Sequence, residues 1–153
     1  MSLPPKFLPD EDAAAAFGAR LAPLLMAGDI VCLEGPLGAG KTTLARGLIK
    51  AYCGAREVPS PTFTLVETYQ GHEAALWHFD LYRLEQPSDV WELGLEDALD
   101  DGVCLIEWPE RIAGLLPENV LRLNFQIPKD GGRMLHIEAG DDWRKRLQAA
   151  GII

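Results

Sequence analysis

The sequence has no long apolar run. No segment of its 153 residues approaches the roughly 18 consecutive apolar residues that a membrane-spanning helix needs. The first residues, M-S-L-P-P-K-F-L-P-D, also lack the apolar centre of a secretory signal peptide. We therefore expect no association with a membrane and a cytoplasmic location.

Basic residues are scarce. The chain has 14 Lys and Arg against 23 Asp and Glu, so its formal net charge is -9, and the bases form no stripe along the sequence. An acidic surface repels the phosphate backbone of nucleic acids. We expect no direct binding of nucleic acid, so that any role in a nucleic-acid pathway would be exercised through another protein.

Cysteine is also rare. Cys32, Cys53 and Cys104 form no C-x-x-C pair and are odd in number, and the first and last lie inside apolar runs. Such a pattern is not typical of a disulfide framework or of a zinc site. We interpret all three as small core residues in a reducing compartment.

What the sequence does contain is an alternation of strand and helix patterns within one domain, residues 1–153. Apolar or alternating runs predict strands, and periodic segments predict helices. We predict an α/β fold of the P-loop NTPase type, with a mixed, mainly parallel central sheet flanked by helices and including antiparallel hairpins. Strands are expected over 29–33, 64–69, 74–82, 103–107, 120–127 and 133–138, and helices over 11–26, from 41 to 53, 87–99, 110–116 and 142–150, with Asp10 and Asp141 as N-caps and a turn over 70–73.

Glycine is concentrated in one stretch. Gly35 to Thr42 reads G-P-L-G-A-G-K-T, between a buried-strand pattern and a helical one, and fits the G-x-x-x-x-G-K-[ST] loop that cradles phosphates. Its glycines allow successive N–H groups to converge on an anion at the helix N-terminus. Lys41 is expected to reach the β and γ phosphates, and the Thr42 hydroxyl to bind Mg²⁺. The predicted ATP-binding residues are Gly35, Pro36, Leu37, Gly38, Ala39, Gly40, Lys41, Thr42 and Thr43.

Two acids close strand patterns. Asp80 ends L-W-H-F-D and Glu107 ends V-C-L-I-E. Ligands of doubly wound sheets lie outside the carboxyl ends of the strands, where both acids can meet the phosphate loop. Either acid could take the Walker B part, so both are predicted as Mg²⁺ ligands and catalytic groups, together with Lys41.

A proline-rich segment follows the glycine-rich loop and its predicted helix. V-P-S-P-T-F, residues 58–63, cannot form a helix because two prolines flank Ser60. We predict that Ser60 and Thr62 belong to a switch-like loop that senses the γ phosphate.

The segments G-P-L-G-A-G-K-T-T, P-S-P-T-F-T-L-V-E-T-Y, H-F-D-L-Y-R-L, E-L-G-L-E-D and I-E-W-P-E occur in this order. Over about residues 10–140 the chain resembles the TsaE (formerly YjeE) family of small bacterial P-loop ATPases. That resemblance implies a role in the threonylcarbamoyl modification of adenosine in tRNAs that read ANN codons. It also implies that the chain acts with TsaB and TsaD, and that ATP hydrolysis resets their complex between turnovers.

Carried over by position, the resemblance implies that Lys41 and Thr42 bind phosphate and Mg²⁺, while Asp80 and Glu107 support the metal and the attacking water. Trp108 follows Glu107 as in the family, and is expected near the site, at a partner surface or as a half-buried aromatic. TsaB and TsaD would hold the tRNA, in agreement with the acidic charge and with no direct tRNA binding by this chain. Because no arginine finger is evident near the phosphate loop, we expect weak hydrolysis by the isolated chain and stimulation by these partners.

Three other functions remain open at this stage. A small-molecule kinase would need a lid arginine, for which Arg83 and Arg111 are single candidates. A GTPase would need an [NT]-K-x-D segment, and Pro128-Lys129-Asp130 lacks its leading residue and spacing. In a nucleotide-gated binding module, ATP would order residues 60–64 for docking to a partner and hydrolysis would be incidental.

Overall fold

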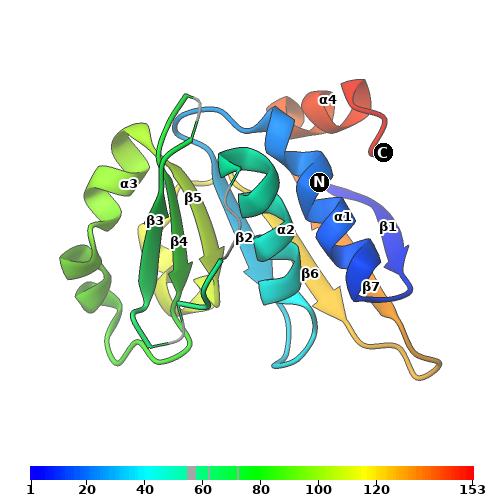
Figure 1. Ribbon diagram of the computed structural model, residues 1–153, viewed down its shortest axis with the longest axis horizontal. Coiled ribbons are helices and arrows are strands. Elements are labelled where there is room, and N and C mark those ends of the chain that lie inside the picture. The colour runs from blue at the N-terminus through cyan, green and yellow to red at the C-terminus, as the bar shows by residue number, and fades with distance from the viewer. Residues whose placement is uncertain (55–57, 62, 72) are drawn as a thin grey trace.

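The molecule is built on one twisted sheet, seen in a computed structural model that describes residues 1–54, 58–61, 63–71 and 73–153. Within these residues the strand order is β1-β7-β6-β2-β5-β4-β3 (Figure 1). The inner strands β6, β2, β5 and β4 are parallel, and the outer pairings are antiparallel. The expected mixed sheet with two hairpins is confirmed. The strands are β1 (Ser2–Leu8), β2 (Ile30–Glu34), β3 (Val66–Tyr69), β4 (Leu76–Asp80), β5 (Val103–Glu107), β6 (Leu121–Gln126) and β7 (Arg133–Glu138).

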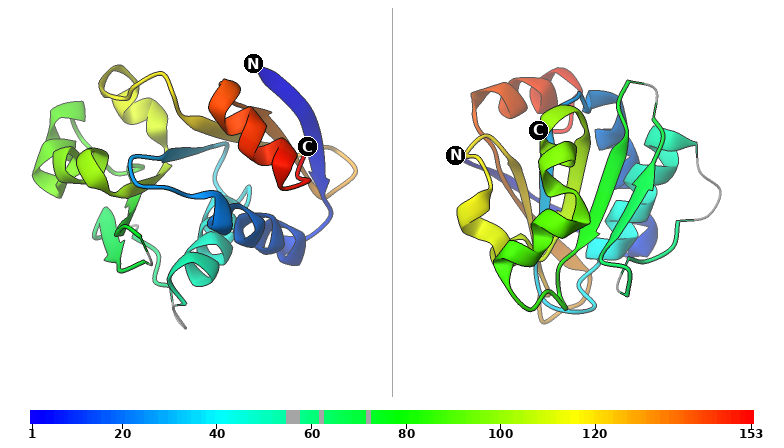
Figure 2. Two further views of the ribbon diagram at one scale, coloured as in Figure 1. Left: turned by 90° about the horizontal axis from the view of Figure 1, so that it is seen from above. Right: turned by 90° about the vertical axis from the view of Figure 1, so that its left-hand side faces the viewer.

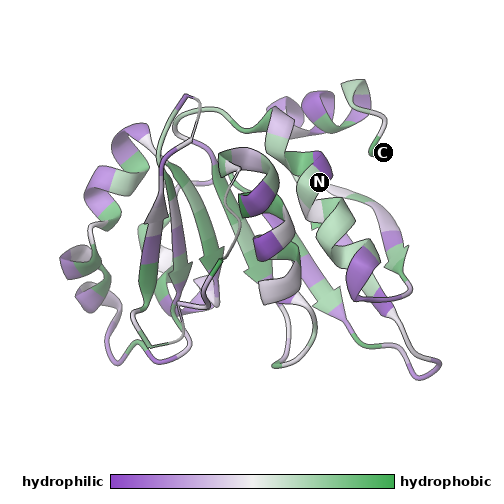
Figure 3. Ribbon diagram, in the orientation of Figure 1, coloured by the Kyte–Doolittle hydropathy of each residue, from purple (hydrophilic) through white to green (hydrophobic). Residues whose placement is uncertain are grey.

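Helices cover both faces of this sheet, which is why the central strands β2 and β5 are apolar up to the glutamate that ends each of them (Figure 3). On one face lie α1 (Glu11–Leu21) and α2 (Lys41–Cys53), and on the other lie α3 (Leu95–Asp101) and the 3₁₀ segments η2 (Pro87–Leu93) and η3 (Pro109–Leu115) (Figure 2). The last helix, α4 (Asp141–Ala149), lies across the end of the sheet at which β2 begins. The opposite end, where the parallel strands finish, carries the phosphate loop.

Helix α1 begins as expected and ends earlier. The Asp10 side chain accepts a hydrogen bond from the Ala13 N–H at 2.8 Å, which confirms the N-cap. The helix stops at Leu21 rather than near Met26, and residues Ala22–Leu24 form the 3₁₀ segment η1. Pro23 accounts for this ending, because it has no backbone N–H to continue the hydrogen bonds of the α-helix.

Strand β1 was not expected from the sequence. Pro4 and Pro5 suggest a break, but the segment pairs with β7 at the sheet edge, with a register shift between Leu3 and Lys6. Proline cannot donate to a strand ladder and is tolerated at edges and bulges. The partner strand lies at the other end of the chain, so local sequence carried no sign of the pairing.

Three smaller expectations need comment. Asp141 does not cap α4: Gly140 is the N-cap without a side-chain bond, and Asp141 instead lies in the first turn, where the helix dipole favours a carboxylate. The turn over 70–73 includes His72, which is outside the described residues. Cys32 and Cys104 are buried, which raises the pKa of both thiols to about 12, whereas Cys53 is only half-buried.

In the part of the chain that the structure describes, no helix combines the length and apolarity required to cross a membrane.

Candidate functional site

The glycine-rich loop turns sharply between β2 and α2 at the carboxyl edge of the sheet (Figure 1). Gly35 has φ 137° and Gly40, the N-cap of α2, has φ 113°, which are angles that residues with a Cβ rarely adopt. A Cβ on Gly35 would lie 2.8 Å from the carbonyl oxygen of Phe125 on β6. The loop is therefore held close to the sheet, with the N-terminus of α2 at its end.

Lys41, the first residue of α2, folds back over this loop. Its ammonium donates to the carbonyl oxygens of Gly35 and Pro36, the latter at 3.1 Å, and lies 3.7 Å from the centre of the Trp108 ring. The side chain is 5% exposed, and this burial lowers the lysine pKa, while the negative charges of nearby carboxylates oppose the shift. A buried cation with carbonyl and ring partners is available to an incoming anion.

Thr42 and Glu107 meet at the start of the helix. The Thr42 hydroxyl donates to Oε1 of Glu107 at 2.9 Å, and Glu107 is 2% exposed at the end of β5. Asp80 lies beside Glu107 in register on β4, and its Oδ1 accepts from the Tyr82 N–H at 3.1 Å. The two strand-terminal acids therefore reach the phosphate loop together, as the sheet topology predicted.

A cavity of about 360 Å³ opens over these groups. Leu37 to Thr43 of the loop line it, together with Asp80, Glu107, Tyr82 and Trp108. Its far wall comes from the start of α1 and from the β6–β7 hairpin, through Leu8, Pro9, Asp10, Glu11, Ala14, Gly132 and Arg133. Gly35 and Pro36 border a second, more open hollow behind the loop.

Two functional residues escaped the sequence analysis. Arg133 on β7 braces the loop, since its guanidinium donates to the carbonyl oxygens of Ala39 at 3.1 Å and Gly38 at 3.2 Å. His78 on β4 lies 2.7 Å from Oε2 of Glu107 through Nε2. Strand alternation, which puts His78 on the same face as Asp80, was a usable signal for the histidine, but no local pattern indicated Arg133.

Other candidates lie elsewhere. Ser60 is exposed and is not among the described residues that line the cavity, and Thr62 is outside the described residues. Arg83 lies over the Phe63 ring at 4.7 Å, and Arg111 lies over the Tyr82 ring at 5.9 Å. Neither arginine lines the cavity, so neither is placed as a kinase lid residue in the described structure.

The donor set beside the loop fits Mg²⁺. This ion prefers oxygen ligands, and usually takes one or two from protein side chains while water and phosphate complete its coordination. The adjacent Thr42 Oγ1 and Glu107 Oε1 are such oxygens at the floor of the cavity, with Asp80 nearby. No group of three or more His, Cys, Asp or Glu suited to a metal occurs among the described residues, so a metal here would depend on phosphate oxygens as well.

Comparison with known proteins agrees with this geometry. Residues 8–135 match the model of a family described as threonylcarbamoyl adenosine biosynthesis protein TsaE. The chain belongs to the TsaE family. Similar relatives are the TsaE proteins of Rickettsia bellii, 43% identical over 81% of this chain and 84% of that protein, and of Haemophilus influenzae, 40% identical over 95% of both. The crystal structure of Bacillus subtilis YdiB has a TM-score of 0.82 at 27% identity, and covers 99% of this chain and 96% of its own.

Proposed function

We propose that this member of the TsaE family is a Mg²⁺-dependent ATPase that supports TsaB and TsaD in the threonylcarbamoyl modification of adenosine in tRNAs that read ANN codons. The observation that carries the proposal is the Thr42–Glu107 hydrogen bond at the floor of the cavity, beside the buried Lys41 ammonium. A cation for phosphate and a paired hydroxyl and carboxylate for Mg²⁺ are the two parts that a P-loop ATPase needs. The assignment to this pathway is supported by membership of the TsaE family.

The loop and Lys41 would bind the triphosphate. The N-terminus of α2 presents unpaired N–H groups and the positive end of the helix dipole toward the cavity. Phosphate oxygens would compete with the carbonyl oxygens of Gly35 and Pro36 for the Lys41 ammonium. Because a charged acceptor binds an ammonium more strongly than a neutral carbonyl does, the exchange is favourable.

Thr42, Glu107 and Asp80 would serve the hydrolytic step. Thr42 and Glu107 would hold Mg²⁺, which would neutralise the charge that develops on the phosphates. Asp80 lines the same cavity and shares the strand edge with Glu107, so it is our candidate for orienting the attacking water. The chain's own groups thus bind, orient and stabilise, and none of them forms a covalent intermediate.

The partner requirement follows from the arginines. Arg133 is the arginine among the described residues that lines the cavity, and its guanidinium is bound to the carbonyl oxygens of Gly38, Ala39 and Gly132. These bonds hold the guanidinium against the loop, and no other arginine among the described residues lines the cavity to stabilise charge on a transferred phosphoryl group. We therefore propose that hydrolysis is weak in the isolated chain and is stimulated by TsaB and TsaD, which would also hold the tRNA.

The test combines calorimetry with turnover. We expect the purified chain to bind ATP and ADP, to hydrolyse ATP only with Mg²⁺, and to turn over faster when TsaB and TsaD are titrated in. Lys41→Ala should abolish nucleotide binding or turnover, whereas Lys50→Ala, on the exposed side of the same helix, should change neither. Asp80→Ala and Glu107→Ala should reduce hydrolysis more than binding.

Four results would contradict the proposal. Absence of heat on titration with adenine nucleotides would exclude the binding site. Equal turnover with and without TsaB and TsaD would exclude stimulation. Full Mg²⁺-dependent hydrolysis by Glu107→Ala would show that the metal assignment is wrong, and tighter competition by GTP than by ATP would change the substrate.

A further inference from the structure

His78 is a fully buried histidine at the floor of the site. It lies in the middle of β4, two residues before Asp80, and is 0% exposed. Its register partner on β5 is Leu105, two positions before the pair formed by Asp80 and Glu107. Alternate residues of a strand share a face of the sheet, and so do register partners on adjacent strands. His78, Asp80 and Glu107 therefore all project toward the layer that contains α2.

Among the described residues, the polar partner of its imidazole is Glu107. Nε2 lies 2.7 Å from Oε2 of Glu107, and Nδ1 is buried with no hydrogen-bond partner among the described residues. An ionised carboxylate can only accept, so the imidazole donates to it through Nε2–H. A buried polar atom without a partner costs free energy, which makes a histidine here a poor choice for packing alone.

Glu107 is held from both sides as a result. One carboxylate oxygen accepts from Thr42 and the other from His78. The Thr42 hydroxyl is itself a proposed Mg²⁺ ligand, so it would exchange its bond to Glu107 for the metal when Mg²⁺ binds. His78 lies in the middle of β4, which is paired with a strand on each side, so its position does not depend on the partner that Thr42 and Oε1 take.

We propose that His78 is a positioning residue, which fixes the Glu107 carboxylate so that Oε1 faces the Thr42 hydroxyl and the metal. This inference rests on the proposed ATPase function and deepens it. Hydrogen bonds behind a ligating carboxylate fix its orientation, and their loss typically costs about 10- to 100-fold in metal affinity or activity. His78 does not touch the nucleotide, so its loss should act through Glu107 alone.

Substitution by the two side-chain amides gives a matched test. In His78→Gln the amide nitrogen reaches the place of Nε2, whereas in His78→Asn the shorter side chain brings its nitrogen near the place of Nδ1 and away from Glu107. We expect kcat to fall about 10-fold or more in His78→Asn, to recover to within about 3-fold of the parent in His78→Gln, and the Mg²⁺ concentration for half-maximal turnover to rise only in His78→Asn. ATP affinity measured without Mg²⁺ should stay within about 2-fold in both.

A second readout does not depend on turnover. Long-range ¹H–¹⁵N spectra of the histidine side chains should show His78 as the Nε2–H tautomer, and its Nε2 resonance should move in Glu107→Gln but not in Glu110→Gln. Equal loss of kcat in His78→Asn and His78→Gln, in proportion to their thermal stability, would mean a structural role and would overturn the inference. So would an His78 spectrum that does not respond to Glu107→Gln.

Failure of the proposed function would look different. If the parent chain with TsaB and TsaD shows no turnover of ATP, the ATPase proposal falls. The positioning role is then decided by the spectra and by whether Mg²⁺ increases ADP affinity in the parent and in His78→Gln more than in His78→Asn.

Discussion

Trp108 carries a backbone conformation that its residue type does not favour. Its φ of 61° and ψ of 50° are left-handed, a region that costs a non-glycine residue roughly 1 kcal/mol or more. The conformation turns the chain directly after Glu107 and places the indole against Lys41 at 3.7 Å and Tyr82 at 4.9 Å. A cation over an indole contributes roughly 0.5 to 2 kcal/mol. The Trp108 ring therefore stabilises the Lys41 ammonium in its present position, and a bound phosphate would compete with the ring for that ammonium.

This contact makes Trp108 a reporter of nucleotide binding. We expect ATP to change the tryptophan emission of the chain, because the ammonium leaves the ring for the phosphates. In Trp108→Phe the change should disappear while calorimetry still detects binding, since Trp77, Trp91 and Trp143 are not among the described residues that line the cavity. Persistence of the full change in Trp108→Phe would place its origin elsewhere.

At the scale of elements, the position of the phosphate loop depends on how closely α2 packs on α1. Gly18 of α1 and Gly47 of α2 lie at the crossing, and a Cβ on either would overlap backbone atoms of the opposite helix. The overlap at Gly47 falls on the Ala15 carbonyl, which cannot move as the end of a side chain can. The two glycines thus set the separation of the helices, and with it the width of the cavity between the start of α1 and the loop.

Gly47→Ala should therefore destabilise the fold, although alanine has the higher helix propensity. An exposed glycine-to-alanine change within a helix stabilises by about 1 kcal/mol, but overpacking at this crossing should lower the free energy of unfolding by roughly 1–3 kcal/mol. Urea unfolding measures the sum of the gain from helix propensity and the loss from overpacking. Gly114→Ala is the control, because nothing lies within 4 Å of its added Cβ, and this exposed change within η3 should stabilise the fold by up to about 1 kcal/mol. Stabilisation by Gly47→Ala would show that the helices have room to separate.

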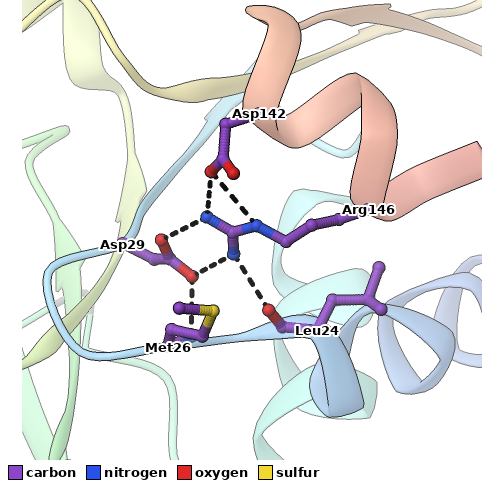
Figure 4. Close-up of polar contacts among 5 residues, drawn as sticks. All are labelled: Leu24, Met26, Asp29, Asp142 and Arg146. Carbon is purple, nitrogen blue, oxygen red and sulfur yellow. Dashed lines mark hydrogen bonds and ion pairs between the residues drawn. The ribbon is translucent and has the colours of Figure 1, made fainter. Parts of the chain in front are cut away.

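At the scale of the whole molecule, one arginine joins the last helix to the segment that precedes β2. The Arg146 guanidinium on α4 donates to both carboxylate oxygens of Asp29, at 2.6 and 3.0 Å, and also to Asp142 and to the Leu24 carbonyl (Figure 4). Asp29 in turn accepts from the Met26 N–H at 2.6 Å. The bonds to Asp29 are the main reason that the pKa of Arg146 lies above its usual range. The cluster joins α4, η1 and the start of β2.

Removing Arg146 should destabilise the fold and leave the site intact. The side chains of Arg146 and Asp29 are 15% and 10% exposed, so Arg146→Ala would leave a mostly buried carboxylate with fewer partners. We expect a loss of about 2 kcal/mol or more, seen as a lower Tm in calorimetry. Arg144→Ala, which removes an exposed pair with Asp141 on the same helix, should cost less than about 1 kcal/mol. Equal losses in the two variants would mean that the cluster contributes no more than a surface ion pair.

Local sequence was sufficient for much of this molecule. The positions of β2, β5 and β7, the Asp10 cap, the two hairpins and the loop from Gly35 to Thr42 follow from apolar period, capping and turn chemistry, all of which act within a few residues. The meeting of Asp80 and Glu107 was also predictable, because parallel strands end at a common edge.

What local sequence could not indicate were relations between distant segments. The pairing of β1 with β7, the brace of Arg133 on the loop and the bond of His78 to Glu107 join residues 29 to 136 positions apart. Strand alternation puts His78 on the same face as Asp80, but the partner of each of these residues is set only when the chain has closed over it. The sequence by itself determined which segments are strands, helices and the anion-binding loop, because short-range sterics and periodicity decide these. Only the tertiary structure decided which buried groups support that loop and its acids, because burial and hydrogen-bond partners exist only in the packed sheet.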